Sequence, residues 1–242
     1  MQANIFFNSI KNWDNKTWLS SSRYVNSFNK FLIKQGSLNQ NSKIIDIGCG
    51  RGKILGSLFY KLKLKDKPLG LDIESHKDRD RRIIFKRVDA VTFFKNNKKT
   101  FDLILIKQTI HLLKLYEIKK LLRLCKKKLT HSGKIIILNL DPSQNQIPTF
   151  PLMNKILKIS FAKDKKITNL ISILYPTRVT KKFIFKVKIS RKKYLEMVKN
   201  RYISILLQLS SKEILDGMKK LEIKYKKTLR FKDKLRCIII KR

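Results

Sequence analysis

The segment from Ile44 to Gly52 constrains the fold of this chain more than any other, because an apolar run ends there in a glycine-rich turn. Isoleucines surround Asp46, and glycines follow at positions 48, 50 and 52. The β-branched run predicts a buried strand, and the glycines allow the backbone to leave it tightly and to approach a ligand closely. Apolar residues at positions 54, 55, 58 and 59 continue at helical spacing. The segment therefore predicts a strand, a turn and a helix that together bind a nucleotide.

The glycine spacing separates this turn from two other nucleotide-binding loops. A dinucleotide-binding turn needs G-x-G-x-x-G, whereas here the third glycine comes one residue early and Lys53 occupies its place. A P-loop needs a further glycine before its Gly-Lys pair and a Ser or Thr after it, and these positions hold Ile47 and Ile54. Both interpretations are excluded, which leaves the pattern D-x-G-x-G-x-G.

Strand and helix signals alternate through residue 140. Strands are predicted at 43–47, 69–73, 83–88, 101–106 and 134–140. Helices are predicted at 1–35, 52–62 and 110–129, the last of them closed by Ser132-Gly133. Because strands that alternate with helices form parallel sheets, this order predicts an α/β fold with a doubly wound sheet.

The segment 141–242 is less regular. A polar loop is expected at 141–150, followed by apolar segments at 152–161 and 167–174. Alternating apolar residues predict a strand near 183–189, and a final strand is expected at 235–240. Helices are expected at 191–201 and 211–226, with Ser190 and Ser211 at their starts.

Carboxylates stand at the ends of three predicted strands. Asp46 ends the first, Asp72 follows the last glycine of the turn by about twenty residues, and Asp89 follows the third strand. A carboxylate at Asp72 can accept hydrogen bonds from both hydroxyls of a ribose, and one at Asp89 can accept a hydrogen bond from an adenine amino group. Ile73 and Ala90 beside them would enclose the base with apolar surface. We therefore expect a nucleoside to lie across these strand ends.

These features together resemble class I S-adenosylmethionine-dependent methyltransferases over residues 43–140. The glycine pattern matches the first motif of that family, Asp72 and Asp89 match the acids after its second and third strands, and 107–111 matches the segment after its fourth. The tail is more loosely similar to small-molecule methyltransferases of the trans-aconitate type, through the segments Arg201–Ser204, Ser211–Gly217 and Phe231–Leu235.

The resemblance implies one domain over residues 1–242 with a mostly parallel, seven-stranded, Rossmann-like sheet. Strands near 183 and 235 would close this sheet as an antiparallel hairpin, with a helical segment at the N-terminus and a helical insertion near the C-terminus. In this division 1–42 is an N-terminal helical cap, 43–140 is the cofactor-binding core, and 141–242 holds the substrate-side insertion and the terminal strands.

The implied cofactor is S-adenosyl-L-methionine, whose sulfonium methyl is already electrophilic, so that the protein mainly aligns the acceptor and excludes water. The cofactor-binding residues that the resemblance implies are Asp46, Gly48, Cys49, Gly50, Gly52, Asp72, Ile73, Asp89, Ala90 and Lys107. Cys49 is interpreted as a packing residue rather than a nucleophile.

Lys107 and His111 are the candidate catalytic residues, because they follow the fourth strand one helical turn apart. His111 could act as a base or orient a substrate oxygen, with capping or packing as the alternative. Trp13 and Trp18 would either line a lid or anchor the N-terminal helix. An arginine in the tail is suited to pair with a carboxylate. The candidate substrate-binding residues are Tyr24, Gln108, His111 and Arg201.

The net charge of +40, from 57 Lys and Arg against 17 Asp and Glu, has two interpretations. It favours nucleic acid or another polyanion as a partner, because lysines release phosphate counterions on binding. It is also typical of a genome with AT-biased codons, since lysine, isoleucine and asparagine are all abundant and the lysines are spread along the whole chain. We favour the second interpretation, because a dedicated RNA-binding face would cluster its charge and enrich arginine.

The function that these residues favour is methyl transfer to a small molecule, with a carboxylate or another oxygen as the candidate acceptor. The first alternative is an RNA- or protein-directed methyltransferase that docks through its basic surface. The second is a nonenzymatic nucleic-acid-binding protein on the same fold. No Asn/Asp-Pro-Pro-Tyr box follows the fourth strand and no Pro-Cys pair is present, which counts against the common base-modifying classes.

The sequence also limits location and metal chemistry. No apolar run reaches the length of a membrane span, and the first 22 residues have neither the apolar core of a signal peptide nor the arginine content of a transit peptide. Three cysteines in unrelated contexts indicate neither a disulfide framework nor a zinc site. We therefore expect a cytoplasmic protein without a membrane partner or a metal, and its oligomeric state is left open.

Overall fold

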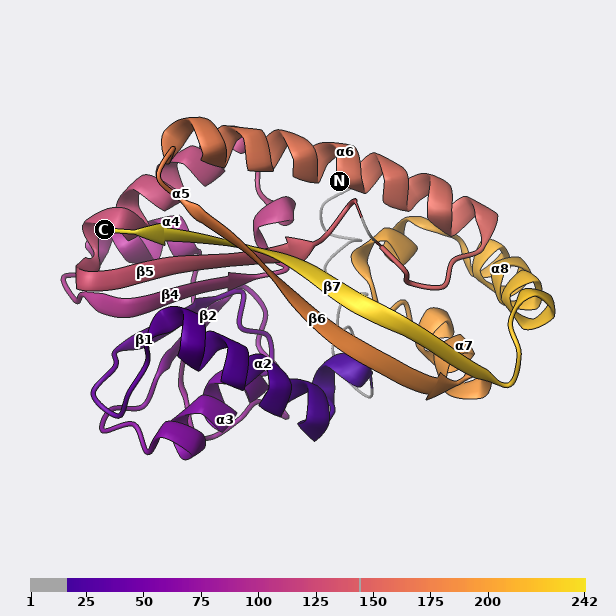
Figure 1. Ribbon diagram of the computed structural model, residues 1–242, viewed down its shortest axis with the longest axis horizontal. Coiled ribbons are helices and arrows are strands. Elements are labelled where there is room, and N and C mark those ends of the chain that lie inside the picture. The colour runs from indigo at the N-terminus through magenta and orange to yellow at the C-terminus, as the bar shows by residue number, and fades with distance from the viewer. Residues whose placement is uncertain (1–16, 144) are drawn as a thin grey trace.

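In the computed structural model, which describes residues 17–143 and 145–242, one seven-stranded sheet runs through the molecule (Figure 1). The strand order is β3-β2-β1-β4-β5-β7-β6. β1 to β5 pair in parallel, whereas β7 is antiparallel to both β5 and β6. The strands span Ile44–Ile47 (β1), Leu69–Asp72 (β2), Ile84–Arg87 (β3), Phe101–Lys107 (β4), Leu129–Leu140 (β5), Val179–Ser190 (β6) and Thr228–Lys241 (β7).

Helices cover both faces of the sheet, so the expected doubly wound, mostly parallel architecture is confirmed. α2 (Ser22–Gly36) and α3 (Lys53–Leu62) lie on one face, and α4 (Ala90–Asn96) and α5 (Leu115–Lys127) lie on the other (Figure 1). The long α6 (Pro151–Leu174) runs along the top of this view, and α7 (Arg191–Lys199) and α8 (Ser211–Lys224) pack together beside the far end of the β6–β7 hairpin. Short 3-10 turns lie at η2 (Trp18–Ser20), η3 (Ile110–Leu112) and η4 (Ser204–Gln208).

β4 shows why the centre of the sheet is buried on both faces. Leu103 and Leu105 belong to the apolar cluster that includes α2 and α3, whereas Ile104 and Ile106 belong to the cluster that includes α5. All four side chains are at most 1% exposed. Because side chains alternate between the faces of a strand, an uninterrupted apolar run is buried only when both faces are covered.

The order in which the strands follow one another places a crevice between β1 and β4. From β1 the chain proceeds outward to β2 and β3, and it then returns to pair β4 with the other edge of β1. The loops that follow β1 and β4 therefore lead to helices on opposite faces. Ligands of open α/β sheets bind in the crevice at such a switch point.

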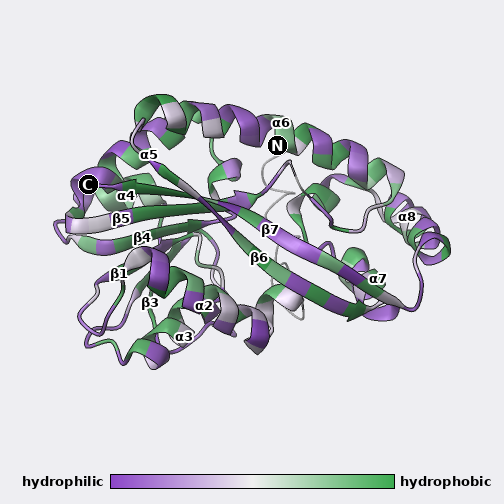
Figure 2. Cartoon of the chain, viewed as in Figure 1, coloured by the Kyte–Doolittle hydropathy of each residue, from purple (hydrophilic) through white to green (hydrophobic). Residues whose placement is uncertain are grey.

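The β6–β7 hairpin is amphipathic. Phe183, Phe185, Val187 and Ile189 on β6 are buried while the residues that alternate with them are exposed, and Figure 2 shows this alternation along the strand. On the buried face the ring of Phe183 contacts those of Tyr24 and Phe28 from α2. The predicted strand near 183–189 is confirmed, and β7 begins at residue 228 rather than at 235.

The predicted start of the helix at 110–129 is wrong. α5 begins at Leu115, and the extended residues Leu113 and Lys114 separate it from the η3 turn. The helical spacing of apolar residues continues through this break, because periodicity reports which side chains are buried and not whether two intervening residues are helical.

The predicted start of the strand at 134–140 is also wrong, since β5 begins at Leu129 and contains Ser132-Gly133. A Cβ at Gly133 would lie 2.7 Å from the Phe101 carbonyl oxygen, and the pairing of β4 with β5 shifts register beside this residue. The glycine that was taken as a helix terminator therefore permits a close contact inside a strand.

The apolar segments at 152–161 and 167–174 form the single helix α6. Pro151 occupies its first turn, where proline is well tolerated, and the residues between the two segments are mostly lysines. None of the helices that the structure describes is long and apolar enough to cross a membrane.

Serine side chains begin three of the helices. Ser190 accepts a hydrogen bond from the Lys193 amide and caps α7, as predicted. The N-cap of α8 is Ser210 rather than Ser211, and Ser210 forms a capping box with Glu213. Of the helix predicted at 1–35, α2 begins after Ser21, and residues 1–16, with Trp13 among them, lie outside the described residues.

Replacing Gly217 with alanine tests how tightly α8 packs on the core. Alanine is a better helix former than glycine by about 1 kcal/mol, but a Cβ at Gly217 would lie 2.6 Å from ring atoms of Phe150, which is 2% exposed. We expect Gly217→Ala to lower the free energy of unfolding in urea by about 1–3 kcal/mol, as overpacked cores do. Asp216→Ala, on the exposed face of the same helix, is the control and should be neutral or slightly stabilising. A more stable Gly217→Ala protein would contradict this packing.

Candidate functional site

A cavity of about 290 Å³ lies at the crevice between β1 and β4. The loops that follow β1 to β4 line one part of it. Residues of η2, α6, η4 and β7 line the rest. The cavity thus gathers side chains from both ends of the chain.

The turn after β1 brings bare backbone to the cavity. Gly48, Gly50 and Gly52 have left-handed φ values of 73°, 53° and 70°, which glycine adopts without strain. The amide of Gly48 donates to the carbonyl oxygen of Leu71 at 2.8 Å. A Cβ at Gly48 would overlap the Thr109 side chain, so the close approach of the two loops at the switch point also requires glycine.

Asp72 joins the turn after β1 to the loop after β2. Its Oδ2 atom accepts a hydrogen bond from the Gly50 amide at 2.8 Å, and its Oδ1 atom accepts one from the Glu74 amide at 3.1 Å. Each carboxylate oxygen can accept a further hydrogen bond. Ile73, which is 46% exposed, and Ala90 line the same cavity. The cavity therefore offers both acceptors and apolar surface to a nucleoside.

Asp89 lines the cavity as the N-cap of α4. Its Oδ1 atom accepts a hydrogen bond from the Thr92 amide at 2.9 Å. This contact fixes the orientation of the carboxylate and stabilises the helix start.

Asp46 is a buried acid with an unsatisfied oxygen. The residue is 3% exposed, and its Oδ1 atom has no hydrogen-bond partner within the described part of the chain. Burial raises the pKa of Asp46 to about 8. The positive charge of Lys107 opposes this rise, and the negative charge of Asp72 adds to it. Because an unpaired buried polar atom is costly, a cation or a donor bound here would be stabilised.

Lys107 ends β4 and places its ammonium against two aromatic rings. The Nζ atom lies 5.6 Å from the ring centroids of both Tyr24 and Phe28, and it donates to Gln108 Oε1 at 3.0 Å. Gln108 has a φ of 51°, a left-handed value that is uncommon for a residue with a side chain. Cation–π attraction and the hydrogen bond hold the charge of Lys107 at the cavity wall.

His111 lies in η3 and lines the cavity. Burial lowers the pKa of its imidazole to about 4, and the charge of Lys163 acts in the same direction. The Lys163 ammonium donates to the carbonyl oxygen of His111 at 2.6 Å. The imidazole is therefore neutral near pH 7, with one donor and one acceptor nitrogen.

Asp233, which the sequence analysis did not single out, reaches the cavity from β7. It is 1% exposed, and its Oδ2 atom accepts a hydrogen bond from the Trp18 indole nitrogen at 3.1 Å. Trp18 meets Tyr202 edge to face, with the ring centroids 5.2 Å apart. Burial raises the pKa of Asp233, although the hydrogen bond from Trp18 and the charge of Lys107 oppose the rise.

A sequence signal for Asp233 does exist. The buried residues at every second position of β7 are Leu229, Phe231, Asp233, Leu235 and Cys237. An acid in the apolar phase of an amphipathic strand is the exception that indicates a paired or functional group. Because the final strand was expected to begin at residue 235, position 233 lay outside the predicted alternation.

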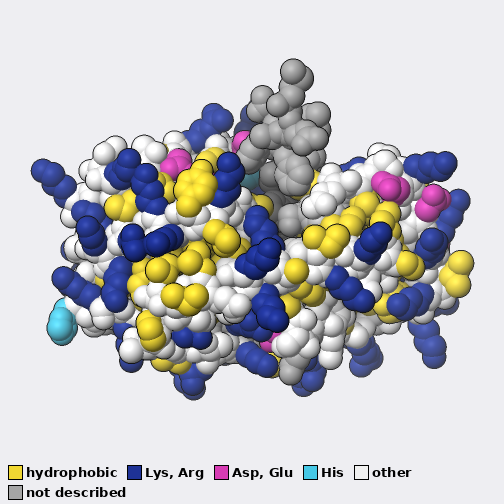
Figure 3. All heavy atoms as spheres, turned by 90° about the horizontal axis from the view of Figure 1, so that it is seen from above, with side chains coloured by type: hydrophobic (Ala, Val, Ile, Leu, Met, Phe, Trp, Pro, Cys, Tyr) yellow, Lys and Arg dark blue, Asp and Glu magenta, His cyan; other side chains and the backbone are white. Residues whose placement is uncertain are grey.

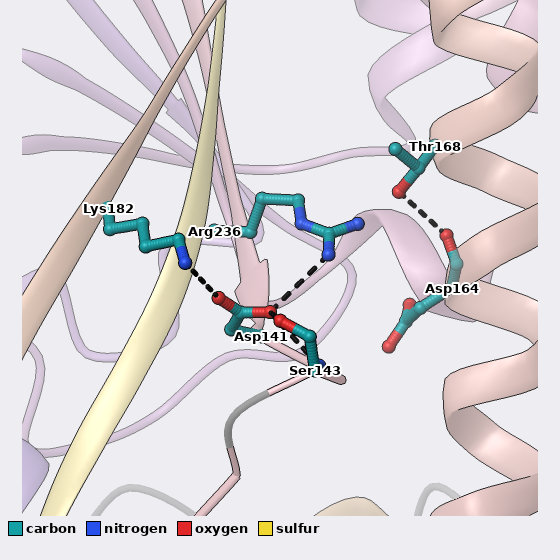
Figure 4. Close-up of polar contacts among 6 residues, drawn as sticks. All are labelled: Asp141, Ser143, Asp164, Thr168, Lys182 and Arg236. Carbon is teal, nitrogen blue, oxygen red and sulfur yellow. Dashed lines mark hydrogen bonds and ion pairs between the residues drawn. The ribbon is translucent and has the colours of Figure 1, made fainter.

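A further acid, Asp164, reaches the cavity from α6. It is 7% exposed, and burial raises its pKa to about 6 against the charges of Lys163 and Arg236. Figure 4 shows its side chain projecting from α6, while its backbone oxygen accepts a hydrogen bond from Thr168 at 2.8 Å. Asn139 donates to its Oδ1 atom at 3.3 Å.

Asp141, at the end of β5, is held instead by neighbouring cations and a hydroxyl. Its Oδ1 atom accepts hydrogen bonds from Ser143 Oγ at 2.7 Å and from Arg236 at 3.3 Å, and its Oδ2 atom lies 3.6 Å from Lys182 Nζ (Figure 4). Against the effect of burial, these contacts lower the pKa of Asp141. The cluster links β5, β6 and β7 and does not line the cavity.

The cavity brings together most of the predicted site residues. Its lining includes Asp46, Gly48, Cys49, Gly50, Asp72, Ile73, Asp89, Ala90, Lys107, Gln108 and His111. Trp18 both lines the cavity and anchors the start of the described chain in the core. The sulfur of Cys49 packs so closely on Gly70 that a Cβ there would lie 2.6 Å from it.

Three predicted site residues lie outside the cavity lining. Gly52 begins α3 and packs against Ile83. Tyr24 is fully buried, and burial raises the pKa of its hydroxyl well above the usual range. Arg201 donates to the carbonyl oxygen of Leu209 at 2.7 Å and so supports the segment around η4.

The cavity lining is rich in acids although the chain as a whole is poor in them. The chain has 57 Lys and Arg against 17 Asp and Glu, but the described lining holds six acids and two lysines. Figure 3 shows Lys and Arg side chains scattered over the outer face of the molecule. No group of three potential metal ligands occurs among the residues described. The six acids are Asp46, Asp72, Glu74, Asp89, Asp164 and Asp233, and the two lysines are Lys53 and Lys107.

No protein-family model and no curated protein sequence matches the chain. Solved structures do match it. A putative methyltransferase from an antibiotic biosynthesis pathway of Anabaena variabilis is 14% identical, with a TM-score of 0.64 over 89% of this chain and 96% of that one. The plantazolicin methyltransferase BpumL, in complex with a pentazolic desmethylPZN analog and SAH, is 16% identical, with a TM-score of 0.56 over 99% and 94% of the two chains.

A SAM-dependent methyltransferase from Archaeoglobus fulgidus is 19% identical, with a TM-score of 0.52 over 90% of this chain and 94% of that one. These structures match nearly the whole chain at low sequence identity, as expected where a fold is shared. The antiparallel pair of β6 and β7 that closes the sheet is the feature that the resemblance implied, and the structure places β7 between β5 and β6. The chain has the fold of the class I S-adenosylmethionine-dependent methyltransferases.

Proposed function

We propose that this chain is an S-adenosylmethionine-dependent methyltransferase that transfers a methyl group to a small molecule. The observation that carries the proposal is that the glycine turn, Asp46 and Asp72 line one cavity. The structural neighbour BpumL forms a complex with SAH, which supports the choice of cofactor.

The residues present fit this cofactor. The bare backbone at Gly48 and Gly50 leaves room for its methionine part, and the buried carboxyl of Asp46 would favour a positively charged group nearby. Asp72 would accept hydrogen bonds from the ribose hydroxyls and Asp89 one from the adenine amino group. Ile73 and Ala90 would enclose the base, and Cys49, Gly52 and Lys107 would complete the site. When bound, S-adenosylmethionine supplies an electrophilic methyl group on a sulfonium.

In this proposal the predicted division of the chain has a functional meaning. The core at 43–140 holds the cofactor, and the segments before and after it supply the acceptor side. Trp18 comes from the 1–42 segment, and Tyr202 and Asp233 come from the 141–242 segment. Methyl transfer mainly needs alignment and exclusion of water, which apolar and aromatic walls provide.

His111 and Gln108 would orient the acceptor as neutral hydrogen-bonding groups. A pKa of about 4 makes the His111 imidazole a poor proton acceptor but leaves both of its nitrogens able to form hydrogen bonds. Lys107 would favour the ionised forms of Asp46 and Asp233, since its positive charge lowers the pKa of both carboxyl groups against the effect of burial. Tyr24 would act through its ring contact with Lys107, and Arg201 would act by holding the η4 segment.

A small molecule suits this cavity better than a polyanion does. The lining holds three times as many acids as lysines, and those that are ionised repel phosphate groups. An RNA-directed enzyme would need lysines around the strand ends, where Lys53 and Lys107 are the cations that the described lining provides. A nonenzymatic nucleic-acid-binding protein would have no use for the cofactor site, so cofactor binding separates that alternative from the proposal.

Binding of S-adenosylhomocysteine tests the cofactor site. We expect this ligand to raise the melting temperature of the protein, with a stabilisation of about 2.7 kcal/mol when its free concentration is 100 times its Kd. Asp72→Asn should weaken binding about tenfold or more, because it removes a charged acceptor. Isothermal calorimetry measures both affinities.

The matched control is Asp66→Asn, in an exposed loop, which should bind S-adenosylhomocysteine as the wild type does. Asp72 also bonds two backbone amides, so the ligand-induced shift and not the melting temperature alone is compared between proteins. No shift of the wild type at saturating ligand would remove the methyltransferase proposal and favour the nonenzymatic alternative.

The pH dependence of stability tests the burial of His111. Its pKa is lowered from 6.5 to about 4, so the unfolded chain binds this proton more readily than the native one. The resulting contribution of up to about 3 kcal/mol is present above pH 6.5 and is lost as the pH falls toward 4. We expect His111→Asn to flatten the loss of unfolding free energy over this range. His131→Asn, at an exposed position on β5, should retain the wild-type slope, and equal slopes in all three proteins would show that His111 is not buried in this way.

A further inference from the structure

Two acids that the proposed cofactor site does not use line the cavity from α6 and β7. Asp46, Asp72 and Asp89 stand at the ends of β1, β2 and β3, where the proposed cofactor would use them. Asp164 and Asp233 come instead from α6 and β7. In a chain with 57 Lys and Arg against 17 acids, two further buried acids facing one cavity are opposite to what composition predicts.

Asp233 lies beside an aromatic pair. Its carboxylate accepts a hydrogen bond from the indole of Trp18 at 3.1 Å, and the Trp18 ring meets that of Tyr202 with the centroids 5.2 Å apart. All three residues line the cavity, so the carboxyl group and the two rings lie together at its wall. A carboxylate next to aromatic faces is the arrangement that binds an organic cation, through charge pairing and cation–π attraction.

The positive charges of Lys107, Lys163 and Arg236 oppose the raised pKa values of the buried acids only in part. Lys107 is held against the rings of Tyr24 and Phe28, and its charge is shared between two acids whose pKa values stay raised. His111 is neutral. Arg201, the predicted partner of a carboxylate acceptor, donates to a backbone carbonyl outside the lining. Among the lining residues that the structure describes, a carboxylate acceptor would therefore meet acids and no guanidinium.

We propose, on the basis of the methyl transfer proposed above, that the acceptor is an amine with an apolar or aromatic body and that its nitrogen binds at Asp233 beside Trp18 and Tyr202. This replaces the carboxylate or other oxygen that the sequence favoured. The apolar lining residues Ile147, Leu157 and Ile205 would contact the body of the acceptor.

The chemistry of the step suits a buried acid. A bound ammonium must first lose a proton, and Asp233 is placed to accept it, since burial raises the pKa of its carboxyl. The lone pair of the neutral nitrogen then forms the bond to the methyl carbon, and the electrons of the breaking carbon–sulfur bond stay on sulfur. The products are S-adenosylhomocysteine and a methylated ammonium, and the proton on Asp233 passes to water.

Matched pairs of probes test the charge of the acceptor. The full chain is saturated with S-adenosylhomocysteine, and its melting temperature is measured with tryptamine against 3-indolepropionic acid and with 2-phenylethylamine against 3-phenylpropionic acid. We expect each amine to add a further upward shift and neither acid to do so. Acids that stabilise as much as the amines, or amines that give no added shift, would overturn the proposal.

Asp233→Asn tests the residue itself, because asparagine keeps an acceptor for the Trp18 indole but removes the charge. We expect the amine to bind about tenfold more weakly or worse in this variant, with the shift caused by S-adenosylhomocysteine unchanged. Asp216→Asn, on the exposed face of α8, is the control and should bind the amine as the wild type does. An amine shift that survives in Asp233→Asn would overturn the assignment.

The failure of the two proposals can be told apart. If the wild type does not respond to S-adenosylhomocysteine, the proposed methyl transfer fails. If it responds to S-adenosylhomocysteine but not to the amines, the cofactor site stands and the amine assignment fails. Transfer of a labelled methyl group from S-adenosylmethionine to the amine nitrogen, and its loss in Asp233→Asn, completes the test.

Discussion

The hydrogen bond from the Gly50 amide to the Asp72 carboxylate holds together the two loops on which the site depends. Strands β1 and β2 are paired by the sheet, but the loops beyond their ends have no ladder to hold them. Hydrogen bonds from the Gly48 amide to Leu71 and from two backbone amides to the Asp72 carboxylate connect these loops instead. Because two backbone amides fix the orientation of Asp72 before any ligand binds, the side chain is preorganised to accept further hydrogen bonds from a ribose.

The same molecule keeps a basic surface and an acidic cavity. Lys and Arg side chains are scattered over the face that Figure 3 shows, while acids outnumber lysines in the described cavity lining. Burial raises the pKa values of Asp46, Asp164 and Asp233, because the surrounding cations only partly stabilise their charged forms. A cationic ligand would lower the free-energy cost of ionising these buried acids, and an anionic ligand would raise it. The proposed cofactor, with its sulfonium, and an amine acceptor both fit that requirement, whereas an RNA backbone does not.

Much of the fold could be predicted from the sequence, because burial leaves a periodic signal. The apolar run at 101–106 indicated a strand, and the structure covers both faces of it, while the alternation at 183–189 indicated a further strand that is amphipathic. The wrong predictions occur where the same residue pattern is compatible with two backbone conformations. Gly133 permits either a helix end or a close strand contact, and Leu113 keeps helical spacing without a helix. In the site, the strand-end acids were found because parallel strands bring their carboxyl ends to one edge. Asp233 was missed because it belongs to the buried alternation of β7 only when that strand begins before residue 233.

The sequence by itself determined the glycine turn, the acids that follow the strands and the order of the core elements, since all of these are encoded over a few neighbouring residues. Only the tertiary structure decided the acceptor side. Trp18 and Asp233 are 215 residues apart in the chain, and their hydrogen bond exists only because β7 inserts antiparallel between β5 and β6. The acidic character of the cavity was likewise invisible in a chain of net charge +40, because electrostatics at a site depends on which few charges the fold encloses and not on their sum.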